Sequence, residues 1–251
     1  MNSLSVSLLV FGLVFGVGYL ATMIRAVLPE HHLTPETKDT VKLTMGLVGT
    51  MTALILGLLV ASAKSTYDTQ KNDVIDMSAK FILLDRVFAH YGPETAECRA
   101  QLRRAVEHME SLLWPEDRKE AVQLDPSAAA GDSLYDLIEG LQPKDESQRL
   151  LKTQAVNSAI DIAKLRWLFF EQASSAISVP LLAVVICWLS VLSFSFGLFA
   201  PANATAKASL FICALSVSGA IFLILELDEP FRGLIHVPKD PVERALAHLG
   251  K

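Results

Sequence analysis

The sequence predicts an all-α membrane protein, with four membrane-spanning helices and a helical domain inserted between the second and third. Hydrophobic residues make up 51% of the 251 residues although 20% are charged, a mixture expected of membrane spans joined to a soluble part. Four long runs carry no charge at all. The segment 64–177 holds 14 of the 22 Lys and Arg and 19 of the 27 Asp and Glu, so the net charge of −5 arises there.

Each of the four apolar runs can cross roughly 30 Å of hydrocarbon at about 1.5 Å per residue. They are Leu4 to Ile24, Leu43 to Ala63, Ile177 to Phe199 and Ala208 to Leu225. No basic region precedes the first run and no convincing small-residue cleavage site follows it, so we expect a retained span rather than a signal peptide. Pro180 falls in the first turn of the third span, where a missing N–H is tolerated.

The spans divide the chain into 1–63 (spans one and two), 64–176 (inserted domain), 177–225 (spans three and four) and 226–251 (tail). Lys and Arg near the span ends predict the orientation, because cytoplasmic flanks are enriched in both. One side holds Lys64, Lys71, Lys80, Lys164, Arg166, Arg232, Lys239 and Arg244. The other holds Arg25, Lys38, Lys42 and Lys207. This bias predicts a multi-pass protein with the insert and both termini in the cytoplasm.

The inserted domain shows apolar residues at helical spacing and no strand alternation. We expect helices at Lys64 to Tyr91, Thr95 to Trp114 and Ser133 to Leu141, a loop at Asp125 to Asp132, and a long helix capped by Asp145. The first of these continues directly from the second span and ends at Gly92 and Pro93. The last leads into the third span.

Several classes of function are disfavoured by composition and motif. A mildly acidic domain with mixed charges offers no basic face for nucleic acid. No nucleophile elbow, zinc-binding helix motif or phosphate-binding glycine loop is present, so we expect no enzyme, cofactor or resident metal. The group Glu30, His31 and His32 could ligate a metal, but adjacent loop histidines point in different directions. We interpret it as a solvated loop.

The second span carries a narrow stripe of small residues. Counting about 100° per residue, Gly46, Gly49, Ala53, Gly57 and Val60 fall within about 80° of arc, with Thr50 beside them. The stripe lies between Lys42 and Lys64. Small residues at this spacing are typical of close helix packing in lipid. The alternative is a narrow pore in an oligomer, where lysine rings at both mouths would favour anions.

An acidic cluster follows the fourth span, with Glu226, Asp228 and Glu229 preceding Pro230, Phe231, Arg232 and Gly233. The simpler interpretation is a helix end with a turn. The alternatives are docking against Arg166 or Lys64, or a cation site. No Asp, Glu, Lys, Arg or His lies within the four predicted spans, which disfavours a proton-driven pump or stator.

Two stretches resemble a known family. The run from Gly46 and Gly49 through Leu59 into Lys64 and Tyr67 is similar to the second span of the bestrophin-like domain family, which is found mainly in bacteria. The span-exit motif of Asp228, Pro230, Phe231 and Gly233, then Ile235, Val237 and Pro238, is also similar. Arg166, Pro180 and Trp188 match residues around that family's third span. The resemblance extends over essentially the whole chain.

This resemblance implies a location in the bacterial inner membrane and a remote kinship to bestrophins, pentameric chloride-conducting channels whose second span lines the pore. By analogy, the stripe would line the pore of a homo-oligomer, with five copies as in bestrophins. The stripe has no Phe, so the aromatic neck of animal bestrophins has no counterpart, and no acidic loop matches their calcium clasp. A second hypothesis is a membrane scaffold or sensor whose cytoplasmic helices bind a partner. A membrane-bound hydrolase is the third.

Overall fold

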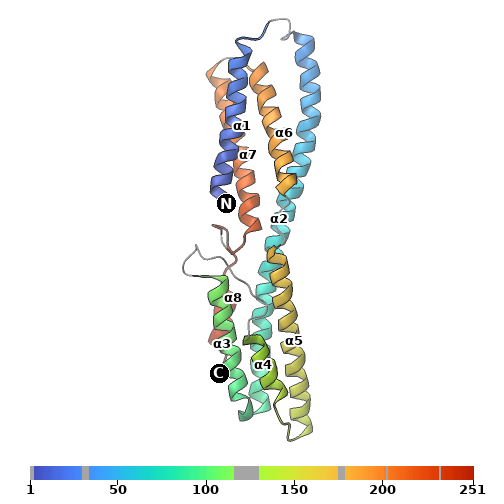
Figure 1. Cartoon of the computed structure of the whole chain (residues 1–251), viewed down its shortest axis with the longest axis vertical. Coiled ribbons are helices and arrows are strands. Elements are labelled where there is room, and N and C mark those ends of the chain that lie inside the picture. The colour runs from blue at the N-terminus through green and yellow to red at the C-terminus, as the bar shows by residue number, and fades with distance from the viewer. Residues whose placement is uncertain (1–2, 30–33, 116–129, 175–178, 202, 232) are drawn as a thin grey trace. The chain divides into compact units, whose positions relative to one another are not determined.

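The computed structural model describes residues 3–29, 34–115, 130–174, 179–201, 203–231 and 233–251. Apart from a single 3-10 turn at Pro93–Thr95, its regular elements are α-helices (Figure 1). They are α1 (Ser3–Arg25), α2 (Pro35–Tyr91), α3 (Ala96–Leu113), α4 (Ala130–Glu139), α5 (Glu146–Ser174), α6 (Val179–Phe199), α7 (Ala204–Asp228) and α8 (Asp240–His248). The predicted all-α class is confirmed over these residues.

The chain divides into two compact units. The apolar unit comprises Met1–Thr66, Ile177–Glu229 and Gly233–Ile235. The polar unit comprises Tyr67–Ala176, Pro230–Arg232 and His236–Lys251. Because α2 contains the division between Thr66 and Tyr67, this one helix contributes to both units.

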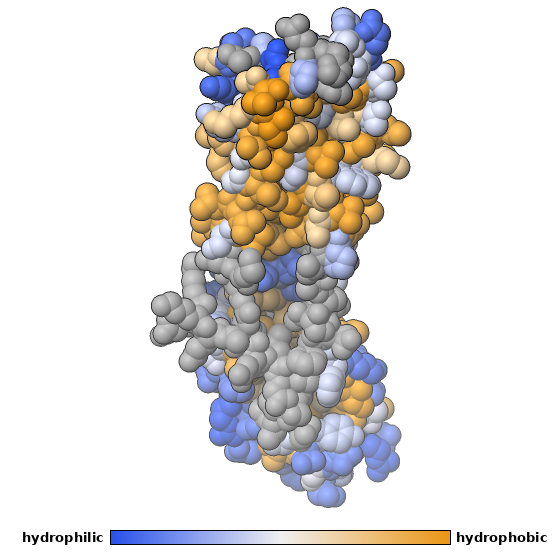
Figure 2. All heavy atoms as spheres, turned by 45° about the horizontal axis from the view of Figure 1, so that its top comes forward, coloured by the Kyte–Doolittle hydropathy of each residue, from blue (hydrophilic) through white to orange (hydrophobic). Residues whose placement is uncertain are grey.

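Four helices of the described chain are long and apolar enough to cross a membrane: α1, α2, α7 and the Pro180–Phe199 part of α6. On the face that Figure 2 shows, hydrophobic side chains accordingly cover most of the apolar unit. The four predicted spans therefore correspond to observed helices. The structure lengthens the fourth at both ends, because α7 runs from Ala204 to Asp228 rather than from Ala208 to Leu225.

Within the apolar unit, α1 packs along α6 and α7. Gly18 of α1 and Gly197 of α6 lie against each other, so a Cβ added at Gly197 would collide with the carbonyl oxygen of Gly18. Ser193 Oγ of α6 donates a hydrogen bond to the Val14 carbonyl oxygen of α1 at 2.8 Å. Because lipid supplies no hydrophobic drive for helix pairing, this close approach and the hydroxyl contact stabilise the crossing.

One face of α2 packs inside the apolar unit. Leu59 and Ala63 are buried against Val185 of α6 and Ile224 of α7. Thr52 is also buried and donates its hydroxyl to the Val48 carbonyl oxygen at 2.7 Å. Because this face is buried, the remaining faces of α2 point away from the core of the apolar unit.

The core of the polar unit begins on the second part of α2, whose buried side chains recur every three or four residues: Val74, Met77, Phe81, Leu84, Phe88 and Tyr91. They share this core with Leu102 and Val106 of α3, Ile138 of α4 and Ala155 of α5. This spacing places one stripe of α2 against its neighbours, as expected of an amphipathic helix.

The helix boundaries in the polar unit confirm most of the sequence-based expectations. Asp145 Oδ1 accepts the N–H of Gln148 at 2.7 Å, so the predicted cap of α5 is present. The expectation of a loop up to Asp132 is wrong at its end, because α4 already begins at Ala130 and includes Gly131. The rest of that predicted loop, residues 125–129, lies outside the described chain.

A partly buried ion pair joins three parts of the polar unit. Arg99 Nε and Nη2 donate to the two carboxylate oxygens of Asp85, both at 2.8 Å. The N–H of Gly250 donates to the same carboxylate at 3.3 Å, and Arg99 also donates to the Lys251 carbonyl oxygen at 3.0 Å. The hydrogen bonds from Arg99 to Asp85 are the main cause of the raised pKa of the Arg99 guanidinium. They connect α2, α3 and the residues after α8.

Candidate pore helix and span-exit motif

Most of the small-residue stripe of α2 is exposed in the apolar unit, and only Gly49 within it is half-buried. A Cβ added at Gly46 or Gly57 would meet no atom within 4 Å, and one at Gly49 would meet only Leu192 Cδ2, at 4.0 Å. Thr50, Ala53 and Val60 are likewise exposed. Close packing against another helix of the same chain therefore does not explain these glycines.

The membrane part of α2 presents three faces. The first is the buried face that includes Leu59 and Ala63, and the second is the small-residue stripe. The third is a row of large exposed side chains, Leu43, Leu47, Leu54 and Leu58. At about 100° per residue, the buried face and the leucine row each lie roughly 100° from the stripe. The leucine row suits lipid, whereas the stripe offers little side-chain surface.

The hydroxyl groups near the stripe are bonded to their own helix. Thr50 Oγ1 donates to the Gly46 carbonyl oxygen at 2.9 Å, and Thr44 Oγ1 donates to the Thr40 carbonyl oxygen at 3.0 Å. In this geometry each hydroxyl presents oxygen lone pairs rather than its proton to the surroundings. Attraction for an anion would therefore have to come from the lysines.

Lys42 and Lys64 lie at the two ends of the stripe, and both are exposed. They are separated by about 33 Å along α2 at 1.5 Å per residue, close to the roughly 30 Å of a hydrocarbon core. No charged residue lies between them. Lys42 Nζ is 3.6 Å from Asp39 Oδ1, but both side chains are more than 70% exposed, so water weakens this ion pair.

The predicted span-exit motif is divided between the two units. In the apolar unit, the buried Glu226 carboxylate accepts hydrogen bonds from the N–H groups of Leu234 and, at 3.3 Å, Ile235. A Cβ at Gly233 would collide with Glu226 Oε2, so a larger residue there would displace the carboxylate onto which the chain turns back. Asp228 is the last residue of α7.

The aromatic part of the motif belongs to the polar unit. The ring of Phe231 lies 5.2 Å from that of Phe169 and 5.7 Å from that of Trp114, measured between centroids. The Pro230 carbonyl oxygen accepts the Val237 N–H at 2.8 Å, and Trp114 Nε1 donates to the Val237 carbonyl oxygen at 2.9 Å. These contacts anchor the segment after α7 in the aromatic part of the polar core.

Glu226 organises the turn after α7, and sequence reasoning did not include it in the span-exit motif. The prediction placed it just past the fourth span in an acidic cluster, whereas it lies within α7 and caps two backbone N–H groups. The available signal was a carboxylate at the end of an apolar run, followed by a glycine seven residues later. The contacts give Glu226 a structural role as the acceptor of the turn.

The Glu30, His31 and His32 group lies outside the described residues. Over the described part of the chain, no three His, Cys, Asp or Glu side chains are grouped closely enough to hold a metal ion.

Comparison with known proteins identifies the family. The profile of the Bestrophin-like domain matches residues 11–242, which include the stripe of α2 and the span-exit motif. No curated protein and no solved structure matches the chain. The resemblance inferred from the α2 stripe and the exit motif is therefore confirmed, and the chain belongs to the Bestrophin-like domain family.

Proposed function

We propose that this protein is a homo-oligomeric channel of the bacterial inner membrane that conducts anions, with the small-residue stripe of α2 lining the pore. Family membership and the four apolar helices support a membrane protein of this kind. The observation that carries the proposal is the exposure of Gly46 and Gly57, with Gly49 half-buried between them and almost no atom near an added Cβ at any of the three. In an oligomer, a face without large side chains leaves room for water and ions along the axis.

The lysines supply the proposed selectivity. Copies of Lys42 and Lys64 around an axis would form a positive ring at each end of an uncharged passage. Such rings attract anions into both mouths, while the neutral stripe holds them weakly enough for release. The chemistry proposed here is electrostatic attraction and partial hydration, without a covalent step.

The proposed orientation places the polar unit and both termini in the cytoplasm. It rests on the excess of Lys and Arg on that side of the spans. In this arrangement Lys64 would lie at the cytoplasmic mouth and Lys42 at the outer mouth. The subunit number of five is an analogy with bestrophins.

Chloride flux from liposomes containing the purified protein tests the proposal. We expect wild-type protein to pass chloride, and Lys42→Glu and Lys64→Glu each to lower the preference for chloride over sodium by about tenfold, a change of about 1.4 kcal/mol in the barrier. Lys207→Glu is the matched control, because Lys207 is an exposed lysine of α7 that lies 5.6 Å from the Tyr19 ring. It should leave selectivity unchanged.

Two results would overturn the channel proposal. One is the absence of flux for any small ion from protein shown to be folded in the liposomes. The other is equal selectivity in all three variants and the wild type. The first result would favour the second hypothesis, a membrane scaffold or sensor whose polar unit binds a cytoplasmic partner.

A further inference from the structure

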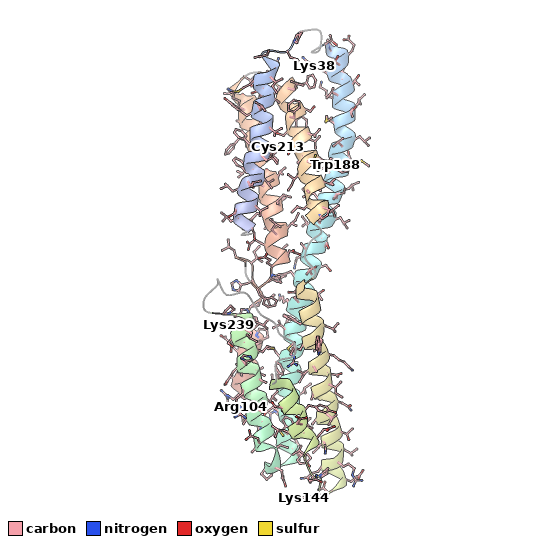
Figure 3. The ribbon with its side chains drawn as sticks, viewed as in Figure 1. Lys38, Arg104, Lys144, Trp188, Cys213 and Lys239 are labelled. Carbon is pink, nitrogen blue, oxygen red and sulfur yellow. The ribbon has the colours of Figure 1, made fainter. Side chains whose placement is uncertain are left out.

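The exposed large hydrophobic side chains of the polar unit lie on two of its helices. Among its described residues, every large hydrophobic side chain that is exposed belongs to α2 or α5, with exposures between 37% and 65%: Ile75, Leu83, Leu150, Ile160, Trp167 and Leu168. The exposed side of α3 instead carries charged residues such as Arg103 and Glu107. Arg104 is a further example (Figure 3). This segregation marks the α2 and α5 surface as a contact face.

Two contacts fix how α2 and α5 are aligned. Lys80 Nζ of α2 lies 3.5 Å from Asp161 Oδ2 of α5. Gln148 Nε2, near the start of α5, donates to the carbonyl oxygen of Tyr91, the last residue of α2, at 2.9 Å. The helices are therefore antiparallel. Since both rise equally per residue, this register makes Ala79 level with Ile160 and Asp76 level with Lys164.

We propose that this face binds a second copy of the same chain, with α2 of one copy against α5 of its neighbour. The inference rests on the proposed function, because an oligomer in one membrane gives all copies the same orientation. An oligomer axis parallel to α2 and α5 is part of this proposal, and rotation about such an axis keeps residues at the same height. Residues that are level within one chain, such as Ala79 and Ile160, therefore meet across the interface.

The charges on this face are complementary in that register. Asp76 and Lys164 are both exposed and carry opposite signs. Lys164 Nζ lies 3.5 Å from Asp161 Oδ1 in its own chain, and both side chains are at least half exposed, so a neighbouring carboxylate can still reach the lysine. Close to the same level, Ile75 of one copy meets Trp167 of the other. In this register an apolar residue meets an apolar residue, and an acidic residue meets a basic one.

The mixture of charges favours a protein partner over a lipid surface. Acidic Asp76 and Asp161 lie among the apolar positions, together with basic Lys80 and Lys164. A bilayer would have to accept the carboxylates as well as the hydrophobic side chains, at a cost in free energy. A neighbouring helix pair can match both, so a second copy is the occupant that fits this face.

Cross-linking of full-length protein in membranes tests this interface. Two differently tagged copies are co-expressed, one with Ala79→Cys and the other with Ile160→Cys, and treated with a short bismaleimide. We expect a product that carries both tags. Ala89→Cys is the register control on the same helix, roughly 15 Å further along α2, and Arg104→Cys on α3 is the control for another face. Each, paired with Ile160→Cys, should give no product above that of wild-type chains.

Charge exchange provides the second arm. Asp76→Lys should abolish most of the Ala79 to Ile160 product, because it faces Lys164, and adding Lys164→Asp should restore it. Labelling of Ala79→Cys by a monofunctional maleimide without any cross-link would overturn the interface. Equal products with Ala89→Cys or Arg104→Cys would overturn it as well, since they indicate random collision.

Ion flux separates this inference from the channel proposal. A specific cross-link in protein without flux would keep the interface and reject the channel. Flux in protein that is labelled but never cross-linked would keep the channel and reject this interface.

Discussion

The apolar unit uses glycine in two opposite ways. At the crossing of α1 and α6, Gly18 and Gly197 let two backbones approach so closely that a Cβ on either would collide with the partner helix. On α2, Gly46 and Gly57 face open space with no atom within 4 Å of an added Cβ. Both sets occur in long apolar helices, so residue type and hydropathy alone do not distinguish them.

The difference separates a structural surface from a candidate functional one. Where glycine permits a helix crossing, a larger side chain must displace backbone, which costs stability. Where glycine faces outward, a larger side chain costs little within the chain and changes only what that face meets. Gly233 gives an intermediate case, because it makes room for a carboxylate rather than for a helix.

The largest expected effect is that of Gly197→Val. Its side chain would collide with the Gly18 carbonyl oxygen and the Ala21 side chain. We expect a loss of about 3 kcal/mol or more, seen as a large drop in the thermal midpoint of the purified protein in detergent. Gly219→Val on α7, where an added Cβ meets nothing within 4 Å, is the control. Equal midpoints for the two variants would contradict the α1 and α6 crossing.

A smaller loss is expected for Gly233→Ala. The methyl group would meet Glu226 Oε2 and displace the carboxylate from the N–H groups of Leu234 and Ile235. Leaving these groups without an acceptor costs about 1–3 kcal/mol. Gly12→Ala, which has open space, should leave the thermal midpoint in place. An unchanged midpoint for Gly233→Ala would show that the turn does not need a glycine.

Glu226→Gln should cost less, about 1 kcal/mol. The amide oxygen can still accept from Leu234 and Ile235, so the substitution removes only the charge that strengthens these hydrogen bonds. Glu226→Ala removes the acceptor itself and should lower the thermal midpoint further. If the two variants melt together well below wild type, the negative charge rather than the acceptor stabilises the turn.

The smallest effect on stability is expected on the stripe. Gly57→Ala should change the free energy of unfolding by no more than about 0.5 kcal/mol, because its side chain contacts nothing in the chain. Gly49→Trp and Gly57→Trp should also insert and fold but abolish chloride flux, since the indole fills the narrow passage. Normal flux in both tryptophan variants would reject α2 as the pore helix.

Local patterns were sufficient to predict most helices. Uncharged runs predicted the four apolar helices, the continued periodicity from Val74 to Val87 predicted that α2 extends to Tyr91, and Asp145 predicted the start of α5. Each of these signals is contained within a few turns of one helix. The start of α4 was misplaced because Gly131 was interpreted as a helix breaker, whereas packing of Leu134 and Ile138 in the core favours the helix.

Contacts between distant residues could not be predicted in the same way. Gly12, Gly16 and Gly18 have similar neighbours in the sequence, yet only Gly18 meets another helix. Which glycine is buried depends on the crossing with α6, which the periodicity of α1 does not specify. The segment after α7 likewise turns back onto Glu226. The residues of this segment that contact Glu226 lie outside the helix, so the apolar pattern of α7 does not predict the contact. The spacing of small residues predicted the stripe, but only the structure showed that most of it is exposed.

The central claim is that the small-residue stripe of α2 borders water, and cysteine accessibility in reconstituted protein tests it most directly. Ala53→Cys and Val60→Cys are placed on the stripe, with Leu54→Cys and Leu58→Cys on the leucine row of the same helix as matched controls. We predict that a charged thiosulfonate modifies the two stripe cysteines and blocks chloride flux, while the leucine-row cysteines do not react. Equal protection of all four positions, or reaction only on the leucine row, would contradict the account.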